Sequence, residues 1–278
     1  MIALQSRSER PDHGRIARLA VAALHHEVHT YPKPGLVSHI DNGAHHDMDF
    51  ALLCRSAAAL GPSFVRFAAA GAGAASMDRL RMIGIEAEET MLSATDGVNT
   101  HRGAIFGMGL LCAAAGFRER YRPGMSLGGI VKTLWATDIL RGPIPLHSHG
   151  TEVARKHGAG GARVEAAAGL PSLYEKALPA LDEGMSLADG HQEAARVHAI
   201  MRLIASVEDT NLLYRGGPDG LAFAQEEARR FLASGSVGMR DWQSMAIAIH
   251  RSFVSRRLSP GGCADLLAMA LFVRDLER

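Results

Sequence analysis

Gly97-Val98-Asn99-Thr100-His101-Arg102-Gly103-Ala104 is the stretch on which the interpretation of the whole chain rests, because it separates two helix-like segments. Before it, residues 83–92 carry apolar side chains at a helical spacing, and Gly97 is a plausible stop signal. After it, residues 104–115 are almost wholly apolar and are followed by Gly116, which predicts a buried helix. The stretch is therefore expected to join two helices of the core.

The same stretch carries polar side chains where the second helix should begin. Asn99 or Thr100 can cap that helix. Its first turn then offers unpaired N–H groups and a partial positive charge beside His101 and Arg102, which suits an anion such as phosphate. A capped core helix whose His and Arg reach solvent is the alternative, and the stretch alone does not separate the two.

Composition predicts an all-α fold. The 278 residues are rich in Ala, only 5% of them are aromatic, and alternating β-branched runs are scarce. We expect a flexible polar lead at residues 1–11, followed by one large multi-helical catalytic domain at residues 12–278. In that domain, polar helix junctions should converge on one pocket. Lys and Arg number 30 against 29 Asp and Glu, so no overall basic field attracts nucleic acid.

The cysteines and the apolar runs indicate in which cellular compartment the protein is expected. Cys54, Cys112 and Cys263 are isolated, which argues against a disulfide framework and for a reducing, cytoplasmic setting. The apolar run at the N-terminus is too short for the hydrophobic region of a secretory signal. No uncharged apolar run reaches the length of a membrane span. We expect a soluble cytoplasmic protein with no membrane partner. The oligomeric state stays open, with a homodimer as one alternative.

The first helix, from Asp12 to about residue 29, should end close to an acidic side chain. Glu27 falls in its last turn, where the helix dipole disfavours an anion, so a Lys from the next loop or a metal should compensate it. Lys33 follows between two prolines, which present it from a stiff, extended loop suited to binding phosphate. A solvated Glu27 and an ordinary turn at Lys33 are the alternatives.

Two further groups of polar residues precede helices or irregular segments. Asp47 and Asp49 come directly before an apolar helix, where they can act as caps or bind a divalent cation. His147 and His149 lie in a Gly-, Pro- and His-rich segment, and zinc binding there is an alternative without a third and fourth ligand at a recognised spacing. A substrate loop is the preferred interpretation of that segment.

The C-terminal half adds helix-start signals. Ser259-Pro260-Gly261-Gly262 places Ser at a cap, Pro at the first helical position and glycines that let a ligand approach the backbone. Asp265 follows in the second turn. Asp209 lies in a polar junction between two helices, and Arg215 in a Gly- and Pro-rich turn soon after it.

Seven motifs occur in the following order: Glu27, residues 32–35, residues 46–49, residues 97–103, residues 161–165, residues 208–211 and residues 259–265. Together they resemble the triphosphoribosyl-dephospho-CoA synthase family over nearly the whole chain. Arg102 stands where many relatives are expected to carry Lys, which keeps the charge but changes the donor geometry.

The resemblance implies that the enzyme transfers the triphosphoribosyl part of ATP to the ribose 2′-hydroxyl of 3′-dephospho-CoA and releases adenine. The product would pass to a phosphoribosyl-dephospho-CoA transferase that acts on an acyl carrier protein. That carrier would belong to malonate decarboxylase or to citrate lyase, and residues 147–151 and 158–163 resemble the malonate decarboxylase type more closely.

This reaction assigns expected roles, because cleaving the C1–N9 bond of ATP builds positive charge on the sugar and calls for nearby carboxylates. The expected catalytic carboxylates are Glu27, Asp47, Asp209 and Asp265. The triphosphate would be held by Lys33, Asn99, Thr100, His101, Arg102, Arg163, Arg215, Ser259, Gly261 and Gly262. The cofactor would be Mg²⁺, bound by Asp47, Asp49, Asp209 and Asp265.

Two other functions fit the same residues. A Mg²⁺-dependent N-glycosidic hydrolase of ADP-ribose-like substrates would use water as the acceptor, so it would release adenine without dephospho-CoA. A non-catalytic helical module would bind nucleotides and release no adenine.

Overall fold

The architecture follows from one long apolar helix around which the others pack. The computed structural model describes residues 12–143 and 160–277. The expected lead at residues 1–11 and the candidate zinc ligands His147 and His149 lie outside these ranges. In chain order the helices are α1 (His13–His29), α2 (Phe50–Ala59), α3 (Gly61–Ala72), α4 (Met77–Ala94), α5 (Arg102–Tyr121), α6 (Leu127–Arg141), α8 (Gly161–Ala167), the π-helix η1 (Ser172–Ala177), α9 (Leu178–Leu187), α10 (Gln192–Ser206), α11 (Thr210–Ala233), the 3-10 helix η2 (Ser236–Gly238), α12 (Trp242–Ser255) and α13 (Gly261–Glu277).

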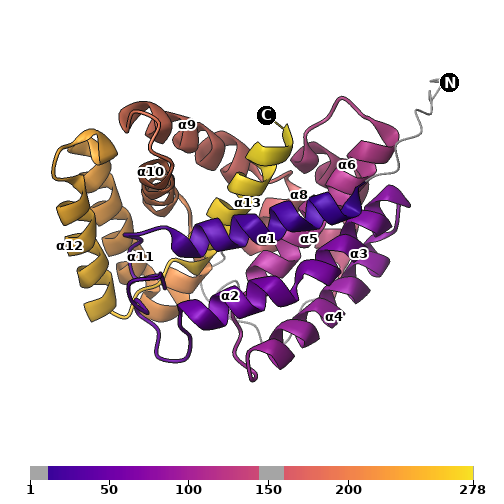
Figure 1. Ribbon diagram of the computed structural model, residues 1–278, viewed down its shortest axis with the longest axis horizontal. Coiled ribbons are helices and arrows are strands. Elements are labelled where there is room, and N and C mark those ends of the chain that lie inside the picture. Colours follow the sequence, from indigo (N-terminus) through magenta and orange to yellow (C-terminus); the bar gives the residue numbers. More distant parts are fainter. Residues whose placement is uncertain (1–11, 144–159, 278) are drawn as a thin grey trace.

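Helix α5 is buried along most of its length, as its apolar sequence predicts. Helices α3, α13, α6, α4 and α1 pack against it. Figure 1 shows α1 crossing in front of α5, with α11 and α12 at one end of the molecule and α3 and α6 at the other. One hydrophobic cluster extends from Ile16 in α1 to Val273 in α13. The described residues contain helices and no strand, so the predicted all-α fold is confirmed.

Helix boundaries agree with most of the capping signals. The Asp12 carboxylate caps α1, and the Asn99 side chain accepts a hydrogen bond from the N–H of Arg102 at the start of α5. The start of α13 differs from the prediction, since the helix begins at Gly261 and the Ser259 hydroxyl is hydrogen-bonded to His45 instead. Within the described ranges, no helix combines the length and the apolar character needed to cross a bilayer.

Helices α3 and α5 cross at very short range because glycines face carbonyl groups on both sides. A Cβ atom at Gly71 would lie 1.8 Å from the carbonyl oxygen of Ala113, and one at Gly116 would lie 1.9 Å from that of Ala68. Neither backbone can accept a methyl group without moving. The two glycines therefore set the distance between α3 and the central helix.

We predict that Gly116→Ala lowers the free energy of unfolding by about 1–3 kcal/mol or more, because the added methyl group overpacks this crossing. Gly84→Ala is the matched control: its Cβ would lie 3.8 Å from the Phe67 ring, an ordinary contact in the middle of α4. That control should gain roughly 0.5–1 kcal/mol from better helix propensity. Urea unfolding followed by circular dichroism measures both, and equal stability of Gly116→Ala and the wild type would contradict the close crossing.

Candidate active site

A buried ion pair lies at the end of α1. The Lys33 side chain is 1% exposed, and its Nζ donates to the Glu27 backbone carbonyl at 2.8 Å and to the Glu27 carboxylate. Burial lowers the pKa of Lys33, and the charge of Glu27 opposes that shift. The prediction that a Lys from the next loop compensates Glu27 is confirmed. Because Lys33 already neutralises a carboxylate, it is not a free cation for phosphate.

Helices α10 and α12 hold the loop that carries Lys33. Arg196 donates to the Thr30 hydroxyl at 2.7 Å from α10. On α12, His250 Nδ1 donates to the Lys33 carbonyl at 2.7 Å, and its Nε2 lies 3.1 Å from an Asp41 carboxylate oxygen. Sequence reasoning missed Arg196 and His250, which lie more than 160 residues from the loop that they contact. No local pattern marks such partners.

His101 lies at the start of α5, directly behind the ion pair. Its Nδ1 is hydrogen-bonded to the Ser56 hydroxyl at 2.8 Å, and Ser56 also bonds the Thr100 hydroxyl at 2.7 Å. Burial, with smaller contributions from His25 and Lys33, lowers the pKa of His101 to about 4. The imidazole is therefore neutral at pH 7. A neutral imidazole can contribute a hydrogen bond to a phosphate group but no positive charge.

Asp209 ties the starts of two helices together. One carboxylate oxygen accepts from the N–H groups of Asn211 at 2.8 Å and Leu212 at 3.1 Å in α11, and the other accepts from Cys263 at 2.8 Å in α13. The side chain is 1% exposed, and its burial raises the pKa of Asp209 against these three hydrogen bonds. The geometry gives Asp209 a structural task that its spacing did not predict.

Asp265 completes the group on the next turn of α13. Its carboxylate lies against Gly103, where a Cβ would be 2.1 Å from Oδ2. Burial, then Glu27 and then Asp209, raise the pKa of Asp265 well above its usual value. The end of α1 and the starts of α5, α11 and α13 thus meet. The structure brings Glu27, Lys33, His101, Asp209 and Asp265 together, and we call these five residues the inner cluster.

A second polar group adjoins the inner cluster where α13 begins. Arg215 donates to His45 Nδ1 at 3.3 Å, and His45 Nε2 donates to the Ser259 hydroxyl at 2.8 Å. Asp47 lies 3.6 Å from His45 with its side chain 63% exposed. We call these four residues the outer group. Asp47 is therefore not among the inner carboxylates with which the sequence grouped it.

Several predicted site residues have local structural partners instead. Arg163 donates to four carbonyl groups around the end of α6, those of Ile139, Leu140, Gly142 and Pro143, so it caps a helix where phosphate binding was expected. The Asp49 carboxylate caps α2 through the Leu52 N–H at 2.7 Å. Arg102 forms an ion pair with Glu88 at 2.9 Å while remaining partly exposed at the start of α5.

The two glycines that begin α13 serve close packing. A Cβ at Gly261 would lie 2.9 Å from the Asn211 side chain, and one at Gly262 would lie 3.0 Å from Asp209 Oδ2. Larger residues would push α13 away from α11. The glycines were expected to admit a ligand to the backbone, whereas in the structure they admit the neighbouring helix start.

The four expected metal ligands are not arranged as one site. Across residues 12–143 and 160–277, no group of three or more His, Cys, Asp or Glu side chains could hold a metal ion. The Asp49 carboxylate caps α2, and both carboxylate oxygens of Asp209 already accept hydrogen bonds from backbone N–H groups. A cage built wholly from protein carboxylates therefore does not match the geometry of this part of the chain.

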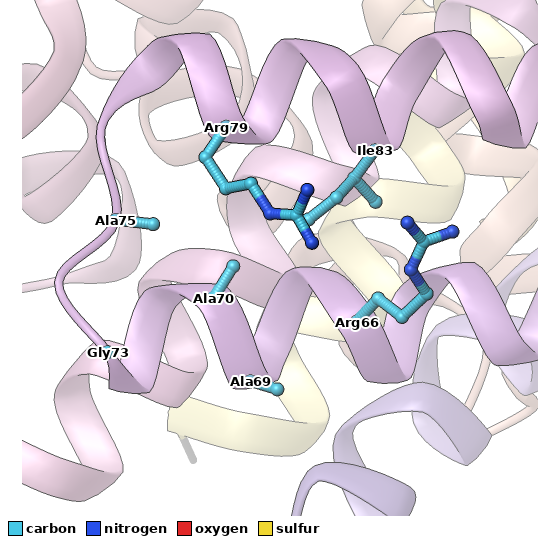
Figure 2. Close-up of a pocket in the computed structure, with 7 residues that line it drawn as sticks. All are labelled: Arg66, Ala69, Ala70, Gly73, Ala75, Arg79 and Ile83. Atoms are coloured by element: carbon cyan, nitrogen blue, oxygen red, sulfur yellow. The ribbon is translucent and has the colours of Figure 1, made fainter.

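A shallow pocket of about 330 Å³ lies away from these clusters, between α3 and α4. Figure 2 shows Arg66 and Arg79 extending toward it from opposite helices above a floor of small apolar residues. Arg66 is already paired with Glu86. None of the predicted site residues lines this pocket, so the expected convergence occurs at the helix junctions and not here.

Known proteins resemble this chain over nearly its whole length. The family model described as ATP:dephospho-CoA triphosphoribosyl transferase matches residues 13–278. A 2-(5''-triphosphoribosyl)-3'-dephosphocoenzyme-A synthase from Pectobacterium atrosepticum is 41% identical over 259 residues, covering 89% of this chain and 84% of the relative. A probable enzyme of the same name from Pseudomonas fluorescens is 38% identical, covering 95% and 92% respectively. No solved structure matches the chain.

We predict that Asp209→Ala lowers the free energy of unfolding by roughly 2–4 kcal/mol, since it removes a helix cap and leaves a buried N–H group at Cys263 without an acceptor. Asp209→Asn should lose less, because its amide oxygen can still cap α11. Asp49→Ala is the control, a single exposed cap expected to cost about 0.5–1 kcal/mol. Urea unfolding separates the three, and equal losses for Asp209→Ala and Asp49→Ala would show that the link to α13 adds nothing.

Proposed function

The chain belongs to the ATP:dephospho-CoA triphosphoribosyl transferase family, and from this premise we propose the reaction in detail. The enzyme transfers the triphosphoribosyl group of ATP to the ribose 2′-hydroxyl of 3′-dephospho-CoA and releases adenine. The observation that carries this proposal is the family match over residues 13–278, because it includes every residue of the inner cluster and the outer group.

The charges of the inner cluster suit the transition state of this transfer. When the bond between the ribose C1 and adenine N9 breaks, positive charge develops on the sugar, and fixed negative charges nearby stabilise it. Glu27, Asp209 and Asp265 lie close enough for the first two to raise the pKa of the third. We propose that the ribose of ATP binds beside these carboxylates.

The triphosphate needs positively charged side chains that can still reach it. The hydrogen bonds that Arg215 of the outer group donates within the described residues go to neutral partners, which are His45 and the carbonyl groups of Ala44 and Arg257, and the nearby Asp47 acts on it through its charge. Arg102 forms an ion pair with Glu88 but stays partly exposed at the start of α5, where the helix dipole also favours an anion. We propose that Arg215 and Arg102 bind phosphate groups, with Ser259 and Thr100 as hydroxyl donors.

The product would serve as the precursor of a prosthetic group. We propose that it passes to a phosphoribosyl-dephospho-CoA transferase, which attaches it to the acyl carrier subunit of malonate decarboxylase, with citrate lyase as the alternative. The resemblance of residues 147–151 and 158–163 to the malonate decarboxylase type supports malonate decarboxylase over citrate lyase.

The test is the dependence of adenine release on the acceptor. Purified protein mixed with MgATP and 3′-dephospho-CoA should release one adenine for each triphosphoribosyl group transferred, as measured by chromatography and mass spectrometry. Omitting dephospho-CoA should lower adenine release at least about 100-fold, because the acceptor hydroxyl must be held against the sugar. Adenine release that does not depend on dephospho-CoA would identify a hydrolase. Nucleotide binding without any adenine would identify a binding module.

We propose that Mg²⁺ enters as the MgATP substrate. Mg²⁺ in nucleotide enzymes keeps several waters and is held chiefly by phosphate oxygens with one or two carboxylates, so it needs no protein cage. The described part of the chain offers no group of three ligands, which supports a substrate-borne ion.

On this basis, excess EDTA should abolish adenine release and added Mg²⁺ should restore it. Mg²⁺ alone at millimolar concentration should leave the midpoint of thermal unfolding unchanged, whereas MgATP should raise it. Full activity in chelator would remove the metal from the reaction. A marked thermal shift with Mg²⁺ alone would show a resident metal site.

A further inference from the structure

We propose that Asp265 is the general base that removes the proton from the 2′-hydroxyl of dephospho-CoA, and that Gly103 is the positioning residue that makes room for its carboxylate. This inference rests on the proposed function. It assigns one role among the carboxylates that the sequence could not rank.

The hydrogen-bond partners of the candidate carboxylates separate them. Glu27 is bound to Lys33, and Asp209 accepts three backbone N–H groups. A carboxylate that already accepts from its neighbours has fewer free lone pairs for a substrate proton. Asp47 and Asp49 lie outside the inner cluster, the first exposed beside His45 and the second capping α2.

Asp265 differs from all four. Within the described residues, no donor forms a hydrogen bond with its carboxylate, although the side chain is partly buried at a meeting point of helix ends. The groups that face it are Glu27 from α1 and Asp209 from the link before α11, both acidic. It is therefore the carboxylate of the inner cluster that remains available to accept a proton.

The crossing of α5 and α13 explains how this carboxylate is held. Gly103 and Gly107 are four residues apart on α5, and Asp265 and Met269 are four residues apart on α13. A Cβ at Gly103 would be 2.1 Å from Asp265 Oδ2, and one at Gly107 would be 2.3 Å from Met269 Sδ. Each glycine thus receives one side chain of α13. Gly107 and Met269 pack in the core. Gly103 and Asp265 place the carboxylate at the start of α5.

The electrostatic surroundings support the assignment. A general base works best when its pKa lies near the working pH, and burial, together with the charges of Glu27 and Asp209, raises the pKa of Asp265 well above that of an ordinary Asp. In the proposed step, the 2′-oxygen forms a bond to C1 of the ATP ribose as the C1–N9 bond breaks. The 2′-hydroxyl proton moves to Asp265, and the electron pair of the broken bond stays with adenine. Adenine then gains a proton from solvent and Asp265 returns its proton to solvent, so that no net proton or hydroxide is formed.

The first test replaces the carboxylate with an amide of the same shape. Asp265→Asn should lower kcat by about 10²- to 10⁴-fold, the usual contribution of a general base, while the Kd for MgATP changes less than about threefold. Asp138→Asn, which alters an exposed carboxylate on α6, is the control and should keep kcat within about twofold of the wild type. Loss of ATP binding in parallel with kcat would instead indicate a substrate-binding role and overturn the assignment.

The second test leaves the carboxylate in place and moves it. Gly103→Ala should lower kcat by about 10- to 100-fold, since a displacement near 1 Å can cost that much. Gly61→Ala is the matched control at the start of α3, where the new Cβ would meet only Val21 at 3.7 Å. If Asp265→Asn does not fold, the comparison of Gly103→Ala with Gly61→Ala still tests whether the position of the Asp265 carboxylate matters for catalysis. Wild-type activity in folded Gly103→Ala would overturn the positioning role.

Protonation supplies a readout that does not depend on activity. Because the folded-state pKa of Asp265 is raised, the wild type loses stability as pH rises from the unfolded-state pKa through the folded-state pKa. Asp265→Asn lacks this loss. Its urea midpoint should therefore exceed that of the wild type at pH 8, and the difference should shrink toward pH 4. A difference that does not depend on pH would contradict the raised pKa on which the base strength depends.

The two levels of proposal fail separately. If the wild type releases adenine only with dephospho-CoA, but Asp265→Asn keeps kcat within about fivefold of it, the assignment of the base is wrong and the transfer stands. If the wild type shows no acceptor-dependent release, the proposed function itself is wrong.

Discussion

The Asp209 carboxylate is the constraint on which the arrangement of this molecule depends. It is almost wholly buried, and its burial raises its pKa, so an anion there is costly. Three backbone N–H groups from the starts of α11 and α13 offset that cost, and the dipoles of both helices add to the effect. Because α13 carries Asp265 and follows Ser259, the same bond sets the positions of the inner cluster and the outer group.

The Lys33 ion pair is not explained by its net contribution to stability alone. A buried salt bridge often contributes little net stability, since both charges must leave water, although removing one partner is expensive. Here the pair also forms at the carbonyl end of α1, where a carboxylate is unfavourable without a cation. Helices α10 and α12 add contacts to hold the loop that carries Lys33. So many contacts around one buried charge are expected where a site needs fixed negative and positive groups at short range.

Sequence reasoning predicted what depends on neighbours along the chain. Helical spacing located α5, the capping signal at Asn99 matches its hydrogen bond to the first residue of that helix, and the dipole argument found the cation that Glu27 requires. The features that the sequence did not predict depend on tertiary contacts. The neutral state of His101 follows from burial, and the helix-capping task of Arg163 follows from the end of α6 lying beside α8. The link from Asp209 to Cys263 joins residues 54 apart, which no local motif announces.

The small residues of α5 connect the fold to the site. Ordinary helices in contact keep their axes 8–10 Å apart, with side chains filling the space. At three glycines of α5, atoms of a neighbouring helix occupy the space that a side chain would fill. Gly116 faces α3, and Gly103 and Gly107 face α13. A chain with 30 glycines and few aromatics can therefore bring carboxylates from distant segments to one junction. The composition that first indicated an all-α fold is also the physical reason that the site can form.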